Sequence, residues 1–396
     1  MKIQNRLKLH IPPELHPHRE RAFPVDTSLV NAIQEPPHRA NLGVLPQLSR
    51  QAQAAQLTAL DRHLQALQLL LSEQLAEVEQ EIQQTTGPTL AQKAGHHLLA
   101  AGGKRLRPLC TLLASRLGPL ANQQKSREHA RDLAVAVELV HAATLLHDDV
   151  VDLAETRRNR PTARLLHGNE VSIFAGDWVL VAALRRICVT GLDGLVPLAL
   201  DTIEQMIFAE VTQSQRAREL AHDRAGYFQV IDGKTAALFR WAMRAGARAG
   251  GADPETESAL VAYGGALGLA FQLSDDALDF DGDAVQTGKP PLADLAEGKV
   301  TLPLLLLLDH EPKFLNDLKL LHAAGLDPHA RQQPEWLAAQ TRVLAGMHET
   351  GAIAGARQVA ARYAHEAAAA LQVLPVHSPE RAALVAVAET LALRTA

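Results

Sequence analysis

The stretch ELVHAATLLHDDVVD, residues 138–152, carries the pattern that decides the fold. Its apolar side chains recur at the spacing of an amphipathic helix, and the helix ends in a cluster of aspartates. The same leucine- and alanine-rich spacing begins near residue 51 and returns up to the C-terminus, with short breaks such as Gly87-Pro88. No alternation of strands with helices is visible. We therefore predict one all-α domain, a single large bundle of about ten helices or more, over residues 51–396.

The composition supports a helical fold and limits the possible partners. Leu and Ala, both good helix formers, dominate the 396 residues, whereas aromatic residues make up only 4%, which argues against an all-β fold. The 39 Lys and Arg against 44 Asp and Glu give a net charge of −5, so no global basic field exists to hold nucleic acid. We predict no nucleic-acid partner, and any anion-binding site must be local.

Residues 1–50 form a separate segment by composition. They hold seven of the 21 prolines and show no sustained apolar period. We predict that this Pro- and His-rich extension is poorly ordered. Acidic residues such as Glu14, Glu20 and Asp26 argue against a mitochondrial presequence, and the residue succession of a secretory signal is missing.

The cysteines and the apolar runs bear on location. Cys110 and Cys188 make no disulfide framework or zinc pattern, which favours a reducing compartment, and we expect both to be buried packing residues. Apolar runs such as Trp178–Leu184 and Pro303–Leu308 fall short of the roughly 20 residues that a membrane span needs. We predict a cytoplasmic protein without a transmembrane segment.

Two aspartate clusters, DDVVD and DDALD, repeat one design inside apolar helical patterns. Residues four apart share a helix face, so Asp148 would project beside Asp152, and Asp275 beside Asp279. Carboxylates stacked in this way repel each other unless a cation lies between them. Mg²⁺ prefers carboxylate oxygens and commonly shares them with substrate phosphates. One such cluster is explained equally well by a solvated acidic face, but two of them beside basic motifs favour a Mg²⁺ site.

Four basic motifs accompany the aspartates: GGKRLRP at 102–108, RRNRPT at 157–162, GKT at 233–235 and GKP at 288–290. Lys104 and Arg107 are close enough in sequence to grip one anion from the start of a helix, and arginine binds phosphate bidentately. GKT is similar to the end of a nucleotide-binding P-loop, but Phe228 occupies the place of the required upstream glycine and no strand precedes it. Two metal-type clusters with separate basic anchors indicate two diphosphates, at least one of them activated by metal.

With these landmarks the chain resembles the trans-type isoprenyl diphosphate synthases of the polyprenyl synthetase family, and among them the long-chain octaprenyl and solanesyl type. The resemblance covers roughly Leu60 to the C-terminus. The landmarks follow the family order: GGKRLRP, ELVHAATLLHDDVVD, RRNRPTA, FAGDWVL, GKTAALF, FQLSDDALDF, TGKP, DLAEGKVTLPL and TGAIAGARQVAARYAHEA. Such a series is specific, whereas one DDxxD motif alone is not.

The resemblance implies a fold, an activity and partners. The fold is a helical bundle of the isoprenoid synthase type around a deep central cavity, with both aspartate clusters at its mouth. The activity is Mg²⁺-dependent condensation of isopentenyl diphosphate with an allylic diphosphate, which yields a longer all-trans polyprenyl diphosphate. The resemblance also implies a homodimer with at most peripheral membrane contact for product release.

The resemblance further assigns roles to residues at matching positions. Isopentenyl diphosphate would be held by Lys104, Arg107, His141 and Arg158. The allylic diphosphate would be held or oriented by Arg157, Lys234, Thr235, Gln272 and Lys289, with Lys299 as a weaker candidate. The principal Mg²⁺ ligands would be Asp148, Asp152 and Asp275, with Asp149, Asp276 and Asp279 contributing directly or through water. The residues predicted to carry catalysis are Asp148, Asp152, Lys234 and Asp275.

Some of these side chains could instead be buried core residues without a role in the site. His141 lies two helical turns before Asp148 and on the same face, which favours a site role over a core histidine. Gln272 precedes Asp275 by three residues and shares its face for the same reason. We expect Phe271 and Tyr227 to be core residues.

Two positions depart from the family pattern. Asn159 follows the paired arginines where the family usually has glycine, but asparagine tolerates left-handed backbone better than most residues. Leu292 stands where glycine is common, which leaves open the shape of the loop that closes over the allylic diphosphate.

Product length is predicted from the helix that precedes Asp148. Ala143 lies about 7 Å along that helix from Asp148, beside Thr144. In the family a bulky aromatic near this point stops elongation, whereas alanine leaves the path open. With no insertion in DDVVD, this favours a long product of quinone side-chain type. The alternative that Ala143 only packs against a neighbouring helix and a deeper residue sets the length remains open.

Other functions remain as alternatives. A class I terpene cyclase needs no second diphosphate site, and GGKRLRP with a second DDxxD favours condensation instead. A shorter-chain farnesyl or geranylgeranyl diphosphate synthase shares all these motifs. A non-catalytic regulatory subunit tends to lose aspartates that this chain retains.

Overall fold

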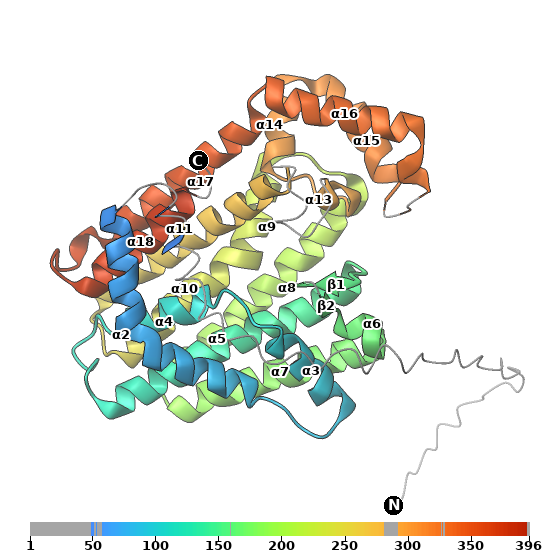
Figure 1. The fold of residues 1–396 in the computed structure, drawn as a ribbon. Helices are drawn as coiled ribbons and strands as arrows, with labels where there is room; N and C mark the ends of the chain where they lie inside the picture. Colours follow the sequence, from blue (N-terminus) through green and yellow to red (C-terminus); the bar gives the residue numbers. More distant parts are fainter. Residues whose placement is uncertain are drawn as a thin grey trace, which may run out of the picture. The chain divides into compact units, whose positions relative to one another are not determined.

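The computed structural model describes residues 49–50, 53, 58–158, 160–280, 292–325, 327 and 329–393 (Figure 1). Nearly all of the N-terminal extension, Asn159 and Lys289 lie outside these residues, so the predictions for them stay predictions. Within the described part, helices dominate and two short strands form one antiparallel pair. The all-α fold class is therefore confirmed.

The helices alternate with short turns. They are α2 (Thr58–Gln83), α3 (Leu90–Ala100), α4 (Leu106–Ser115), α5 (Gln124–Val151), α6 (Ala163–His167), α7 (Asn169–Thr190), α8 (Leu195–Glu219), α9 (Arg224–Ile231), α10 (Ala237–Ala249), α11 (Pro254–Leu278), α13 (Ala293–Ala296), α14 (Leu302–His310), α15 (Leu315–Ala323), α16 (Pro334–Glu349), α17 (Ala352–Ala370) and α18 (Pro379–Leu393). The shorter elements are β1 (Thr156–Arg157), β2 (Arg160–Pro161), the π-helical turn η1 (Asp232–Ala236) and the 3-10 turns η2 (Pro312–Phe314), η3 (Ala330–Gln332) and η4 (Leu371–Val373).

Helix α5 is a central element of the bundle. Its segment LAVAVEL, residues 133–139, is apolar except for Glu138 and is buried throughout. A helix that is apolar on every side requires neighbours on every side. Helices α2, α3, α4, α7 and α10 supply them, and α7 runs along α5 (Figure 1). The first aspartate cluster thus stands at the C-terminal end of a helix that its neighbours hold on several sides.

A second group of helices positions the second cluster. Helix α11 packs along α10 and α17, and the Tyr263 hydroxyl donates a hydrogen bond to the Leu384 carbonyl of α18 at 2.8 Å. Helices α9 and α13–α17 share a second hydrophobic cluster. The DDALD segment occupies the C-terminal end of α11, with Asp279 as its cap.

Residues 233–235, GKT, belong to helices and not to a strand–loop–helix unit. They lie in the π-helical turn η1 between α9 and α10. A Cβ at Gly233 would lie 2.8 Å from the Ala209 Cβ, so glycine lets η1 approach α8 closely. This confirms that no P-loop is present at these residues.

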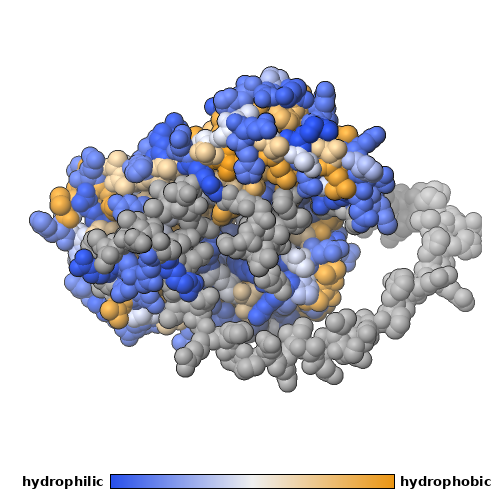
Figure 2. Space-filling view, turned by 45° about the horizontal axis from the view of Figure 1, so that its top comes forward, coloured by the Kyte–Doolittle hydropathy of each residue, from blue (hydrophilic) through white to orange (hydrophobic). Residues whose placement is uncertain are grey.

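The structure corrects one expectation about the cysteines and adds a finding on membranes. Cys110 is buried as expected, but Cys188 is exposed, because it lies on the outer face of α7. No helix in the described part of the chain is long and apolar enough to cross a membrane. Figure 2 shows hydrophobic residues scattered among hydrophilic ones on the visible face.

Candidate active site

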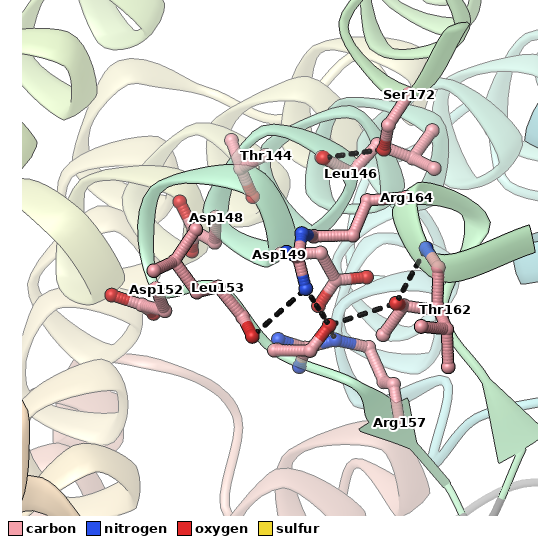
Figure 3. Close-up of polar contacts among 12 residues, drawn as sticks. Thr144, Leu146, Asp148, Asp149, Asp152, Leu153, Arg157, Thr162, Arg164 and Ser172 are labelled. Carbon is pink, nitrogen blue, oxygen red and sulfur yellow. Dashed lines mark hydrogen bonds and ion pairs between the residues drawn. The ribbon is translucent and has the colours of Figure 1, made fainter. Parts of the chain in front are cut away.

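The first aspartate cluster presents two carboxylates on one side of α5. Asp148 and Asp152 lie on the same side of the helix end (Figure 3), as their spacing predicted. Each carboxylate has a lysine beside it. The Lys234 Nζ lies 3.4 Å from Asp148 Oδ2, and the Lys299 Nζ lies 3.1 Å from both oxygens of Asp152. The two lysines bring η1 and the segment after α13 to the end of α5.

Asp149 points to the other side of the helix end (Figure 3). Its Oδ1 accepts a hydrogen bond from the Arg157 Nε at 2.6 Å, and its buried Oδ2 accepts none from the residues that the structure describes. Thr162 donates to the Ala154 carbonyl and caps α6, which holds the turn that follows α5. Asp149 therefore anchors the arginine-bearing strand β1.

Lys234 is shared between two carboxylates. Its Nζ lies 2.5 Å from Glu210 Oε2 on α8, in addition to the contact with Asp148. The pKa of Lys234 is raised above its ordinary value because the attraction of both carboxylates exceeds the opposing effect of burial. The sequence analysis did not identify Glu210, because nothing in the local sequence distinguishes it from the other acidic residues of α8.

The second cluster is tied to η1 by a chain of hydrogen bonds. Thr235 Oγ1 donates to Gln272 Oε1 at 2.6 Å, and Gln272 Nε2 donates to Asp276 Oδ1 at 2.8 Å. The Tyr227 hydroxyl donates to Asp276 Oδ2 at 2.5 Å. Tyr227 is buried in a hydrophobic cluster, which confirms the expected core position, and its hydroxyl in addition contacts Asp276. Asp276 accepts bonds on both oxygens and is thus turned toward the protein.

Burial raises the pKa of two carboxyl groups in these clusters. The pKa of Asp148 rises to about 6, because burial and the nearby Glu210 outweigh the attraction of Lys234. The pKa of Asp276 rises to about 7, again chiefly through burial. The carboxylates are held at a site where added positive charge is favoured.

The predicted isopentenyl diphosphate residues form a cationic group at the start of α4. Arg107 is buried, and its guanidinium lies 4.5 Å from the centre of the Phe239 ring. Its Nε makes no hydrogen bond within the described part of the chain. Lys104 is exposed and lies 5.5 Å from the Phe271 ring centre. Phe271 is thus not only a core residue, because its ring faces Lys104.

His141 and Arg158 complete this group. Burial lowers the pKa of His141 well below its usual range, and the nearby arginines lower it further, so the ring is neutral at pH 7. Arg158 adopts a left-handed backbone with φ 53°, and its guanidinium lies against Gly103. A Cβ at position 103 would lie 3.1 Å from an Arg158 nitrogen, which accounts for the glycine there.

Arg105, which is buried like Arg107, is held by two carboxylates. It lies 2.8 Å from Glu79 and 2.6 Å from Glu138, both measured from its guanidinium nitrogens. These carboxylates raise the pKa of Arg105 against the larger, opposing effect of burial. Arg105 thus neutralises the buried Glu138 and the half-buried Glu79.

The donor set suits a hard divalent cation. Among the residues that the structure describes, no three His, Cys, Asp or Glu side chains come together tightly enough to hold a metal by themselves. Mg²⁺ needs no such cage, because it commonly binds one or two carboxylates and takes its other ligands from water and substrate phosphates. Asp148 and Asp152 offer two carboxylates side by side, so these residues fit the ion.

The remaining predicted residues are located as follows. Ala143 is buried in α5, and Thr144 donates its hydroxyl to the His141 carbonyl of its own helix. Asp275 and Asp279 lie half-buried at the end of α11. Leu292 is buried with φ 63°, a backbone that glycine adopts more easily, which explains why glycine is common at this position.

Comparisons with known proteins show the family of this chain. The family model described as polyprenyl synthetase matches residues 88–331. The octaprenyl diphosphate synthase of Escherichia coli (strain K12) is 35% identical over 300 residues, covering 76% of this chain and 88% of that protein. Component 2 of the heptaprenyl diphosphate synthase of Geobacillus stearothermophilus is 37% identical over 252 residues, covering 63% of this chain and 77% of that protein.

A solved structure shows the same fold. The polyprenyl synthase from Caulobacter crescentus CB15, complexed with calcium and isoprenyl diphosphate, superposes with a TM-score of 0.74 at 37% identity. The match covers 83% of this chain and 97% of that one. The motifs, the helical fold and these matches have one explanation: the chain belongs to the polyprenyl synthetase family and is a prenyltransferase that makes polyprenyl diphosphates from isoprenyl diphosphate substrates.

Proposed function

We propose that this enzyme condenses isopentenyl diphosphate with an allylic diphosphate in a Mg²⁺-dependent reaction and releases a long all-trans polyprenyl diphosphate. The observation that carries the proposal is a pair of contacts at the end of α5: Asp148 lies beside Lys234, and Asp152 lies beside Lys299. Two carboxylates and two lysines from three separate segments make a site for an anion that binds together with cations. A terpene cyclase is the weaker reading, because the separate cationic group around Arg107 supplies a second diphosphate site.

The two diphosphates are assigned to the two cationic groups. Lys104, Arg107, His141 and Arg158 surround the start of α4, and we assign isopentenyl diphosphate to them. Because His141 is neutral, its ring can donate one hydrogen bond without adding charge. We assign the allylic diphosphate to Arg157, Lys234, Thr235, Gln272, Lys289 and Lys299.

Mg²⁺ would be held by Asp148, Asp152 and Asp275, with Asp149, Asp276 and Asp279 in supporting positions. When bound, it supplies Lewis-acid neutralisation of the diphosphate that leaves. Lys234 then stabilises the charge that grows on this leaving group. The allylic carbon is attacked by the double bond of isopentenyl diphosphate, and the proton lost afterwards goes to the departing pyrophosphate. No protein nucleophile is required.

One assay tests the proposed reaction. The purified chain is incubated with isopentenyl diphosphate, farnesyl diphosphate and Mg²⁺, and the dephosphorylated products are analysed by mass spectrometry. We expect a series of prenyl alcohols that grow by one isoprene unit and end at a long chain. Absence of products beyond the starter, from a folded enzyme, would favour the regulatory-subunit alternative. Products that end at farnesol or geranylgeraniol would favour the short-chain alternative.

The proposed long product rests on α5. Ala143 is small, buried and about 7 Å along the helix from Asp148. The Phe ring of Ala143→Phe would block the path of the growing chain. We therefore expect products shortened to roughly C15 or C20 with turnover retained. Ala143→Val serves as the control, with a smaller shortening. An active, folded Ala143→Phe enzyme with unchanged product length would show that Ala143 does not line the path.

We also propose a homodimer joined through α7 and α8. These neighbouring helices carry a row of exposed apolar side chains: Ile173, Phe174, Val181, Val189, Leu200, Ile207, Phe208 and Val211. An exposed apolar surface of this kind marks an interaction site. The relative named component 2 raises the alternative of a different partner subunit, which co-purification from the source cell would reveal.

We place the enzyme in the cytoplasm. The exposed thiol of Cys188 and the buried thiol of Cys110 are both free, and free thiols persist in a reducing compartment. Any membrane contact would be peripheral and would serve product release. Fractionation of the source cell, with the enzyme followed by antibody, tests this location.

A further inference from the structure

We infer that the ion pair between Asp232 and Arg240 is a register clamp, which holds the π-helical turn η1 and thereby orients Lys234 and Thr235. The inference rests on the proposed function, because it assigns positioning residues to the allylic diphosphate site. Arg240 donates two hydrogen bonds to the Asp232 carboxylate, from Nη1 to Oδ1 at 2.7 Å and from Nη2 to Oδ2 at 2.9 Å. A paired geometry of this kind is the strongest form of an arginine–carboxylate contact.

The eight-residue spacing of Asp232 and Arg240 favours a π turn between them over a regular α-helix. Asp232 and Arg240 are eight residues apart, and in a regular α-helix eight residues turn about 80° beyond two full turns, so the side chains would point in different directions. A π turn absorbs one extra residue. The effective spacing then becomes about seven residues, which is close to two full turns and places both side chains on one face. The π register therefore favours the pair that the structure shows.

The backbone shows the same register. The Ala237 N–H donates to the Asp232 carbonyl, which is the five-residue hydrogen bond of a π-helix. Asp232 is therefore held at both its carbonyl and its carboxylate. The Arg240 side chain crosses α11 at Gly265, where a Cβ would still lie 3.4 Å from the Arg240 Nη1.

The turn determines where the two functional side chains point. Lys234 reaches Asp148 on α5 and Glu210 on α8, whereas Thr235 reaches Gln272 on α11. Consecutive residues thus contact helices on different sides. A shift to the α register would rotate the side chains that follow the turn by about 100° relative to those before it, and one of the two contacts would be lost.

Packing also holds η1 between its neighbours and acts together with the ion pair. Gly233 lies against Ala209 of α8, and Ala236 lies against Gly268 of α11. These contacts need small residues at positions 233 and 236, so they support the same register as the Asp232–Arg240 pair. The Asp232–Arg240 pair is half-exposed, so its removal is compatible with folding.

The test compares three variants that break or reverse the clamp. Arg240→Gln and Asp232→Asn remove the pair, and Asp232→Arg combined with Arg240→Asp reverses it. We expect each single variant to lower kcat for condensation roughly tenfold with little change in the KM for isopentenyl diphosphate, because misplacing a group near the reacting atoms costs rate. We expect faster amide hydrogen exchange over residues 232–237 in the single variants. The reversed pair should restore most of both properties.

Arg248→Gln is the matched control. Arg248 lies on the same helix, α10, is similarly half-buried and forms a comparable pair with Glu257, which does not span η1. We expect this variant to keep the wild-type kcat and the wild-type exchange over residues 232–237. Unchanged kcat or unchanged exchange in Arg240→Gln, or no recovery in the reversed pair, would overturn the inference. A wild-type enzyme that performs no condensation would instead contradict the proposed function, and the exchange experiment would still test the clamp.

Discussion

Lys104 and Arg107 should differ from Lys234 in the kinetic constant that they control. The first two are assigned to a diphosphate that does not react, so their contacts stabilise ground state and transition state alike. We expect Lys104→Ala and Arg107→Ala to raise chiefly the KM for isopentenyl diphosphate. We expect Lys234→Ala to lower kcat, because its partner gains negative charge as the bond breaks. Steady-state kinetics with the reverse pattern would contradict this division.

His141 should make the folded protein sensitive to acid. Its pKa is lowered well below 6.5 in the folded state by burial and by nearby arginines, whereas the unfolded chain binds a proton normally. The unfolded state therefore binds more protons once the pH falls below about 6.5, and stability decreases from there toward the folded-state pKa. For one proton the slope is at most about 1.4 kcal/mol per pH unit.

Urea unfolding at several pH values measures this effect. Between pH 6.5 and pH 5 we expect the free energy of unfolding of His141→Gln to fall less steeply with pH than that of the wild type. The difference in slope should be at most about 1.4 kcal/mol per pH unit, the value for one proton. His129, whose pKa is lowered less, provides the control variant His129→Gln. Equal slopes for His141→Gln and the wild type would show that His141 takes up a proton in the folded state.

Some residue contacts were predictable from the sequence and others were not. The four-residue spacing of Asp148 and Asp152 was sufficient to predict that they share a side of one helix. The lysine beside Asp152 comes from 147 residues away, and local spacing carries no information about such a partner. Tyr227 was predicted as a core residue and is buried, but the sequence did not indicate that its hydroxyl bonds Asp276, which is 49 residues away.

At the scale of helices, neighbouring glycines in α11 should respond in opposite ways. A Cβ at Gly264 would lie 2.7 Å from the Phe239 carbonyl oxygen, so Gly264→Ala pushes α11 from α10 and should cost about 1–3 kcal/mol. A Cβ at Gly265 would lie at an ordinary contact distance. Gly265→Ala should stabilise the protein by about 0.5–1 kcal/mol, because alanine loses less backbone entropy in a helix. Thermal unfolding of both variants measures the two changes in stability. Equal changes in Gly264→Ala and Gly265→Ala would contradict the packing argument.

The helices themselves were largely predictable, but the π turn was not. Apolar spacing indicates a helix over α5 and α11, because both bury apolar side chains at helical spacing, such as Leu260, Tyr263 and Leu267 in α11. One extra residue in η1 shifts the spacing by a fraction of a turn, which a short window does not resolve. A glycine such as Gly233 indicates that another element packs closely against it. Which element this is, here α8, depends on the tertiary structure.

At the scale of the whole molecule, the exposed apolar faces of α7 and α8 predict self-association. Phe174 is 61% exposed and Phe208 63%, and the exposed residues on each helix recur at about seven-residue spacing, which keeps them on one face. Burying two such rows against a second copy removes apolar area from water twice over, because a twofold interface uses the same surface on both subunits. We expect light scattering to give the mass of a dimer.

Substitution in this surface should separate assembly from folding. Phe208→Asp places a charge where a second copy would exclude water, so we expect a monomer with an unchanged helical circular dichroism spectrum. Val373→Asp is the control, because Val373 is 57% exposed in η4, outside α7 and α8, and should leave the dimer intact. Since α8 also carries Glu210, which contacts Lys234, the monomer should have a lower kcat than the dimer if subunit contact steadies this helix. A Phe208→Asp enzyme that stays dimeric would place the interface on another surface.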